Sequence, residues 1–146
     1  MAELFVAEPP AVYLARPALV VDASLLAACI FGEEERDAAE VRLRGCTLHA
    51  PGLLDYELTN VAVTKLRRNE LTLDTAMRAL AEFSMMALER HEPIPEEVAS
   101  IASRYRLSAY DAAYLWLAGA LKAPLATFDR QLANAASDYL SQLPAA

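Results

Sequence analysis

The chain has 146 residues, of which 55% are hydrophobic, and it carries a formal net charge of -7. This length and apolar fraction suit one domain with a single core. The negative charge excludes a protein that holds nucleic acid by general positive charge, because phosphate binding depends on Lys and Arg, so any nucleic-acid role has to be local.

Residues 1–17 are expected to form an N-terminal extension, because three prolines interrupt any regular pattern there. The single domain is expected over residues 18–146. In chain order, the pattern predicts a strand at 18–21, helices at 24–30 and 33–44, a weak strand at 47–49, helices at 52–68 and 72–83, a strand at 85–88, helices at 95–105 and 108–121, a strand at 124–127 and a helix from 130. Two segments stay ambiguous: 85–88 is nearly as compatible with helix, and 139–143 fits no single element.

Short apolar strands that alternate with helices indicate an α/β domain with a mainly parallel sheet of about four or five strands, covered on both faces. The apolar run over residues 18–31 is short for a bilayer and contains Asp22 and Ser24, so it is interpreted as a buried strand and helix. Cys29 and Cys46 form no zinc pattern with the two histidines, and the acidic N-terminus is unlike a secretory signal. We expect a cytoplasmic protein without a membrane segment.

Four carboxylates lie within or beside apolar segments, where an unpaired charge is costly: Asp22, Glu57, Asp111 and Asp129. Two of them directly follow expected strands, and the other two lie near the starts of expected helices. Ligands bind at the carboxyl ends of parallel strands, so all four are expected to converge on that edge of the sheet.

Each acid also has an ordinary structural explanation. Asp22 and Asp129 are suited to cap the helices that follow them, and Asp111 stands three residues after Ser108, as in a capping box. Glu57 fits a solvated position near a positive helix end. Taken together, however, four anions at one edge repel each other unless they share a cation, and oxygen ligands of this kind suit Mg²⁺ or Mn²⁺.

Other chemistries find less support in the sequence. Only two histidines are present, neither of them in a recognisable nucleophile motif, so a Ser-His-acid triad is disfavoured. Gly-rich phosphate loops are also absent from the sequence.

Four motifs carry a family resemblance: VVDASLL at 20–26, PGLLDYEL at 51–58, LSAYDAAYL at 107–115 and ATFDRQL at 126–132. In their order and spacing the chain resembles PIN-domain ribonucleases, most closely the VapC-type toxins of toxin–antitoxin pairs. The resemblance implies a PIN-like three-layer α/β/α sandwich.

The resemblance further implies that the four acids form the metal site and its catalytic centre, with Ser24, Thr127 and Asn60 as supporting polar groups. It implies a metal-dependent endoribonuclease that hydrolyses RNA phosphodiester bonds through metal-activated water. The implied partners are RNA, a cognate antitoxin and a second copy of the chain in a homodimer.

RNA that approaches an acidic pocket needs nearby cations, and the candidates are Arg130, Arg67 and Arg68. Residues 65–68 also suit the negative end of a helix dipole, so at least one of these cations is explained by structure alone. Tyr110, Tyr114 and Trp116 are expected in the core rather than against RNA bases.

Two alternatives remain open at this point. An inactive PIN-like module that only binds a protein partner would keep the same fold and acids. A phosphoacceptor receiver domain also has an acidic Mg²⁺ pocket, but it predicts a lysine after the last core strand, whereas Lys122 precedes the expected 124–127 strand.

Overall fold

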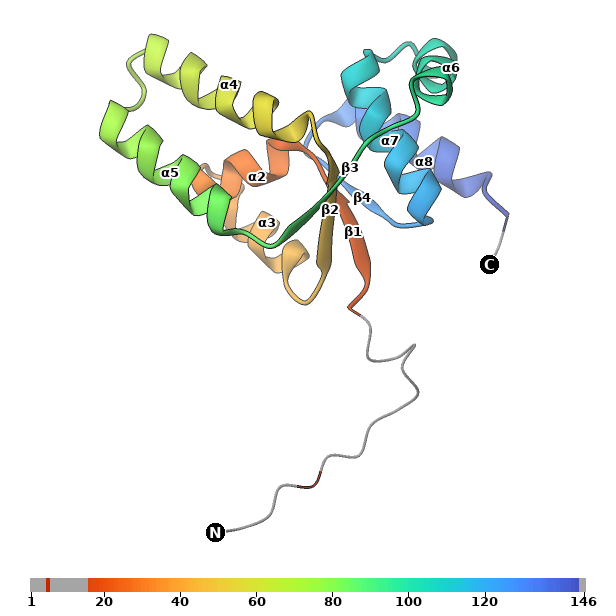
Figure 1. The fold of residues 1–146 in the computed structure, drawn as a ribbon, viewed down its shortest axis with the longest axis horizontal. Helices are drawn as coiled ribbons and strands as arrows, with labels where there is room; N and C mark the ends of the chain where they lie inside the picture. Colours follow the sequence, from red (N-terminus) through yellow and green to blue (C-terminus); the bar gives the residue numbers. More distant parts are fainter. Residues whose placement is uncertain (1–4, 6–15, 145–146) are drawn as a thin grey trace.

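The computed structural model describes residue 5 and residues 16–144, so most of the expected N-terminal extension lies outside the described residues. The centre of the fold is a four-stranded sheet in the order β3-β2-β1-β4, with every neighbouring pair parallel (Figure 1). The strands are β1 (Ala18–Val21), β2 (Thr47–Pro51), β3 (Leu88–His91) and β4 (Leu125–Ala126).

The inner strands form where the sequence is most apolar. Leu19, Val20 and Val21 of β1 are completely buried, as expected for a strand covered by helices on both faces. The β1–β2 pairing runs from Ala18 with Thr47 onward, and the amide of Thr47 donates to the carbonyl of Pro17. The β1 segment therefore anchors the centre of the sheet.

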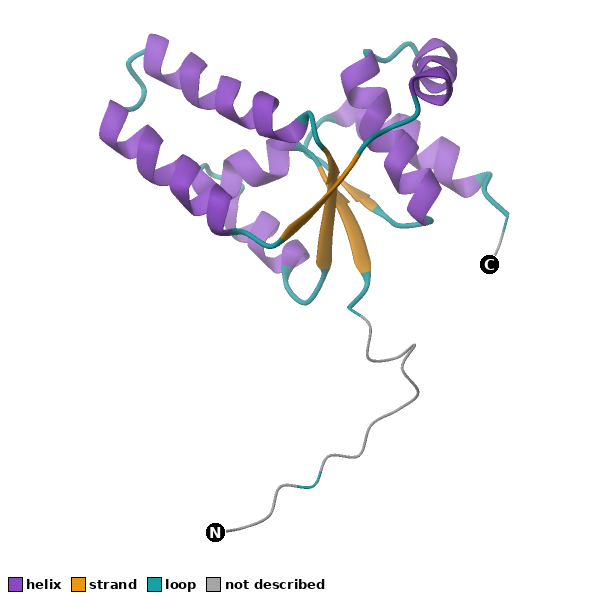
Figure 2. Ribbon diagram, in the orientation of Figure 1, coloured by secondary structure: helices purple, strands orange, loops and turns teal. Residues whose placement is uncertain are grey.

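Seven helices occur in the described part of the chain, and they form two layers (Figure 2). One layer contains α2 (Ala23–Ile30), α3 (Arg36–Leu43), α4 (Leu54–Arg67) and α5 (Leu73–Met85). The other contains α6 (Pro95–Tyr105), α7 (Ala109–Leu121) and α8 (Arg130–Ser141). Figure 1 shows the sheet between these layers, which confirms the expected three-layer α/β/α sandwich.

The third strand differs from its prediction. Residue 85 still belongs to α5, and the strand begins at Leu88 instead of 85. The cause is that β3 lies at the edge of the sheet, where Glu89 and Arg90 are exposed, so the strand lacks a continuous apolar run. Of the apolar run at 85–88, only Met85 belongs to α5, where it is exposed, and Met86 is the C-cap of that helix.

Smaller differences concern element ends. Strand β2 extends to Pro51, two residues beyond its prediction, and β4 is reduced to Leu125–Ala126. The ambiguous C-terminal segment continues α8 as far as Ser141. In residues 16–144, no helix combines the length and apolar character that crossing a membrane requires, and the run at 18–31 forms β1 and α2 as expected.

Candidate active site

Asp22 is the most buried of the four acids, with 6% of its surface exposed. It follows β1 and caps α2, its Oδ1 accepting from the amide of Leu25 at 3.2 Å. Ser24 donates its hydroxyl to the same oxygen at 2.7 Å, and Thr127 donates to Oδ2 at 2.5 Å. The carboxylate is therefore fixed from two strand ends, since Thr127 follows β4.

Glu57 lies in the first turn of α4 and is partly buried. Its Oε1 accepts a 2.7 Å hydrogen bond from the phenol of Tyr114, a residue of α7 on the other side of the sheet. Tyr114 itself is 1% exposed, and burial together with the neighbouring carboxylate raises the pKa of its phenol. The phenol therefore stays protonated and remains a donor to Glu57.

Asp111 and Asp129 complete the set at two further helix starts. The side chain of Ser108 caps α7 by accepting from the amide of Asp111 at 3.1 Å, which leaves the carboxylate of Asp111 outside this capping bond. Asp129 caps α8, its Oδ1 accepting from Leu132 at 2.9 Å. The capping interpretation is thus confirmed for Asp22 and Asp129, and for Ser108 in place of Asp111.

The four acids act on one another electrostatically. Burial raises the pKa of Asp22, Glu57 and Asp111, and repulsion from another acid of the set raises each further. The repelling neighbours are Asp129 for Asp22, Asp111 and Asp22 for Glu57, and Asp129 and Asp22 for Asp111. Hydrogen bonds from hydroxyls partly oppose these shifts.

This donor set fits a hard divalent cation. Its oxygens are carboxylates, which Mg²⁺ and Mn²⁺ prefer, and three of the four groups resist ionisation without a nearby positive charge. A bound cation would relieve both the repulsion and the cost of burial. The residues present therefore suit the metal that the sequence led us to expect.

The supporting groups differ in their placement. Ser24 and Thr127 contact Asp22 directly, and Thr127 also accepts from the amide of Asp129 at 2.9 Å. Asn60 is exposed and lines a shallow surface hollow with Lys65 of α4 and residues of two loops. The supporting role of Asn60 stays a prediction.

Of the three arginines expected to bind RNA, only Arg130 adjoins one of the acids, Asp129. Arg67 and Arg68 end α4, and Arg130 begins α8; all three are exposed and make no ion pair within residues 16–144. Lys65, by contrast, pairs with Glu33 at 3.1 Å. At 1.5 Å per residue, Arg67 stands about 15 Å along the helix from Glu57.

Sequence reasoning missed two features of this region. Tyr114 is buried as expected, but its hydroxyl is bonded to Glu57, and only its position one helical turn after Asp111 hinted at that role. Tyr110 is 65% exposed, contrary to the expected core position. Tyr56 and Phe128 are exposed as well, so an exposed aromatic side chain directly precedes Glu57, Asp111 and Asp129 in the sequence.

The comparisons with known proteins agree with this geometry. Residues 19–138 match the PIN domain family. Ribonuclease VapC3 of Pyrobaculum aerophilum is 34% identical over 121 residues, which cover 80% of this chain and 92% of that protein. Ribonuclease VapC9 of Mycobacterium tuberculosis is 32% identical over 118 residues, covering 80% and 89%.

Two crystal structures share the fold. A protein from Pyrobaculum aerophilum superposes with a TM-score of 0.67 at 25% identity, covering 88% of this chain and 90% of that one. VapC20 of Mycobacterium tuberculosis, described as a toxin that cleaves the sarcin-ricin loop, superposes with a TM-score of 0.60 at 16% identity, covering 80% and 94%. The chain therefore belongs to the PIN domain family and is a relative of the VapC ribonucleases.

Proposed function

We propose that this protein is a Mg²⁺- or Mn²⁺-dependent endoribonuclease and the toxin of a toxin–antitoxin pair. The observation that carries the proposal is the placement of the four acids at helix starts next to the sheet, where burial and repulsion raise the pKa of Asp22, Glu57 and Asp111. Relatives named VapC ribonuclease that align over most of their own length support the same activity.

In this proposal, Asp22 and Asp111 are the central metal ligands, and Glu57 and Asp129 bind a second ion or orient water. When bound, the divalent cation supplies Lewis-acid stabilisation of the phosphate and lowers the pKa of water. Ser24 and Thr127 hold the carboxylate of Asp22 in one orientation by donating to its two oxygens.

Glu57 is suited to receive the proton of the attacking water. Its Oε1 is bonded to Tyr114, which leaves Oε2 to accept a proton. The water oxygen would bond to phosphorus as its proton moves to Oε2 of Glu57, while the bond from phosphorus to the leaving oxygen breaks and that oxygen takes a proton from solvent.

The exposed groups around the site favour single-stranded or looped RNA. Tyr56, Tyr110 and Phe128 offer faces on which unpaired bases stack, and such stacking is tolerant of sequence. Arg67, Arg68 and Arg130 offset phosphate repulsion as RNA approaches the acids. The implied partners beyond RNA are a cognate antitoxin and a second copy of the chain, in the cytoplasm.

Expression in bacterial cells tests this function. Induction of the protein should arrest growth and produce new RNA ends in single-stranded regions, and Asp111→Asn should abolish both effects. The matched control is Asp37→Asn, which changes an exposed carboxylate in the first turn of α3 and should leave both effects intact.

Two outcomes would contradict the proposal. Equal toxicity of Asp111→Asn and the unaltered protein would favour an inactive module that acts by binding a partner. New RNA ends confined to paired regions would contradict the proposed single-stranded substrate.

A further inference from the structure

The two histidines of the chain meet on the sheet although 42 positions separate them in sequence. His49 lies in β2 and His91 ends β3, and His49 Nδ1 is 2.9 Å from His91 Nε2. Glu89 lies directly across from His49 in the strand pairing, and one of its carboxylate oxygens is 3.5 Å from the same Nδ1. The three donor atoms lie within 4.8 Å of one another.

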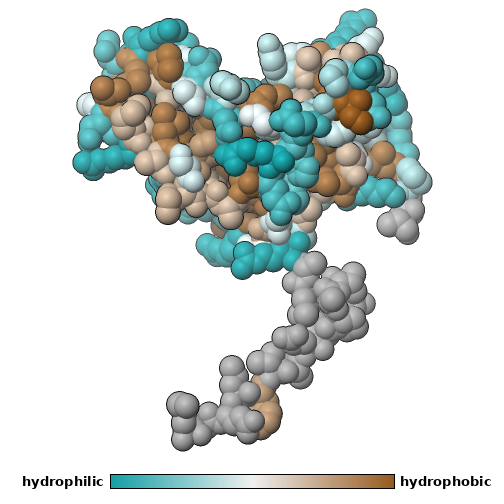
Figure 3. All heavy atoms as spheres, in the orientation of Figure 1, coloured by the Kyte–Doolittle hydropathy of each residue, from teal (hydrophilic) through white to brown (hydrophobic). Residues whose placement is uncertain are grey.

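Strand geometry places these side chains on one face of the sheet. The intervening residue Arg90 points toward α4 and α5, since its guanidinium bonds Asp55 at 2.8 Å and lies 5.6 Å from the ring centre of Phe83. Neighbouring residues of a strand alternate between faces, so Glu89 and His91 face the α6–α8 layer. Figure 3 shows hydrophilic atoms over the middle of the molecule, where β3 runs in Figure 1.

The spacing of the donor atoms matches a metal site. Two ligands bound tetrahedrally to Zn²⁺ at about 2.0 to 2.1 Å are about 3.3 Å apart. The observed separations of 2.9 Å and 3.5 Å lie on either side of that value, so small side-chain rotations would suffice. The two ring nitrogens now share a hydrogen bond, which a bound ion would replace.

Burial and exposure also suit such a site. His49 is 8% exposed, which fixes its ring, while the Glu89 side chain is 64% exposed and leaves one side open to water. Two imidazoles and one carboxylate with an open fourth position are a recurrent ligand set for Zn²⁺ and a poor one for Mg²⁺.

From this geometry we infer that His49, Glu89 and His91 form a second cation site, specific for Zn²⁺ and related borderline-soft divalent ions. Water fills the fourth position. The site is separate from the acidic cluster in both residues and metal preference. Its bound ion ties the edge strand β3 to β2, and so stabilises the loop that leads from β2 into α4, where Gly52 donates its amide to the carbonyl of His91.

The absence of other histidines gives a direct test. In a chain prepared without a histidine tag, every imidazole ¹⁵N signal comes from His49 or His91. One equivalent of Zn²⁺ should shift a nitrogen of both rings and raise the melting temperature by at least about 4 °C, whereas Mg²⁺ should leave the rings unchanged.

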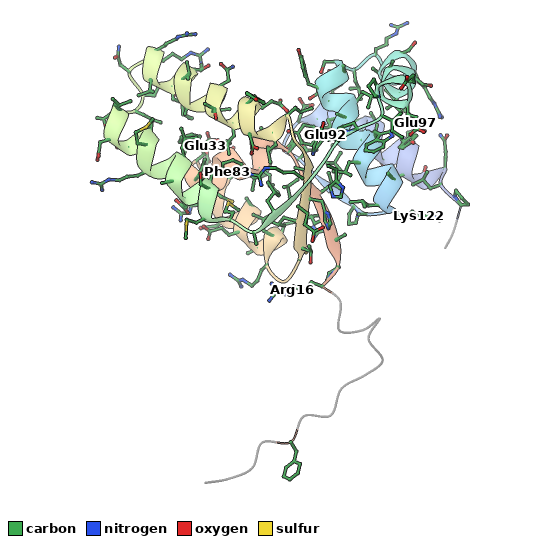
Figure 4. All side chains as sticks on the ribbon, in the orientation of Figure 1. Arg16, Glu33, Phe83, Glu92, Glu97 and Lys122 are labelled. Carbon is green, nitrogen blue, oxygen red and sulfur yellow. The ribbon has the colours of Figure 1, made fainter. Side chains whose placement is uncertain are left out.

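A pair of carboxylate variants makes the test specific. Glu89→Gln should weaken Zn²⁺ binding at least tenfold, and the matched control Glu92→Gln should change it less than twofold. Glu92 is exposed beside the same strand, at the β3–α6 loop (Figure 4), and its Oε1 lies over Gly52 rather than on the histidines. Both changes affect exposed side chains, so both variants are expected to fold.

Two results would overturn the inference. One is imidazole signals that do not move in a tenfold excess of Zn²⁺, which would leave only a hydrogen-bonded histidine pair. The other is equal Zn²⁺ affinity in Glu89→Gln and Glu92→Gln. Neither result bears on RNA cleavage, so this inference and the proposed nuclease activity fail independently.

Discussion

The phenol of Tyr114 donates a 2.7 Å hydrogen bond to Oε1 of Glu57 and thereby joins α7 to α4 across the acidic site. The two residues come from the two different helix layers. Only Oε1 accepts this bond, so it fixes the orientation of the Glu57 side chain and leaves Oε2 available to another ligand.

Replacement of Tyr114 by phenylalanine tests that relationship. Tyr114→Phe keeps the buried ring but removes the donor, so it should lower kcat about tenfold and cost about 1 to 2 kcal/mol of unfolding free energy. Steady-state cleavage kinetics and urea denaturation measure the two effects. Tyr105→Phe, which removes an exposed hydroxyl bonded to Asp138, is the control and should leave kcat unchanged.

A neutral side chain at position 57 should stabilise the metal-free protein. Glu57→Gln keeps the acceptor for Tyr114 and removes a charge that is penalised by burial and by repulsion from Asp111 and Asp22, so the melting temperature in a chelator at pH 7 should rise by about 2 to 4 °C. RNA cleavage should be lost in the same variant. A lower melting temperature for Glu57→Gln in the chelator would contradict the electrostatic coupling of the acids.

The stabilisation by Glu57→Gln should depend on pH in a defined direction. The pKa of Glu57 is raised in the folded protein above its ordinary value of 4.5, so the folded state holds the proton more tightly. The contribution of Glu57 therefore lowers the free energy of unfolding progressively as the pH rises from about 4.5 to the raised pKa. Above that pKa, its contribution is constant.

Thermal melts in a chelator measure this dependence. The melting-temperature difference between Glu57→Gln and the unaltered protein should shrink as pH falls from 7 toward about 4.5. Using the difference between the two proteins removes the effect of carboxylates that titrate in both. A difference that widens on acidification would mean that the pKa of Glu57 is lowered by folding, contrary to its surroundings.

The positions of the candidate site's acids in the fold were largely predictable from the sequence, because local rules identify such positions. Asp22 and Asp129 follow strands and cap helices, and both roles depend only on neighbours in the chain. The edge strand β3 was misplaced because its outward residues are charged, and the pairing with β2 that creates it is a tertiary contact. Local pattern carries no information about such pairing.

The contacts of Tyr114 and the two histidines were not predictable for the same reason. A tyrosine in an apolar helix is expected to be a core residue. The residue that accepts a hydrogen bond from the Tyr114 hydroxyl, Glu57, is 57 positions away in the sequence. His49 and His91 come from separate strands and meet only through the register of β2 and β3. Contacts that depend on strand pairing, rather than on nearby positions in the sequence, become visible only in the structure.

The two arginines at the C-terminal end of α4 should contribute to RNA affinity through their charge alone. Arg67→Glu combined with Arg68→Glu should raise KM about tenfold or more at low salt with little change in kcat, and the effect should weaken as salt increases. Arg78→Glu on α5 is the control, since Arg78 is equally exposed but pairs with Asp74. An effect of Arg78→Glu on log KM half as large as that of the double variant, in proportion to the charge changed, would show that only net charge matters.

The central claim is that the four acids form a metal-dependent nuclease centre. Its most direct test is the rate at which purified protein cleaves a single-stranded RNA, measured across a Mg²⁺ titration and in a chelator, for the unaltered chain and Asp22→Asn. We expect cleavage that saturates with Mg²⁺, vanishes in the chelator and falls at least about 100-fold in Asp22→Asn. Cleavage that persists in the chelator, or an Asp22→Asn protein as active as the unaltered chain, would contradict the account.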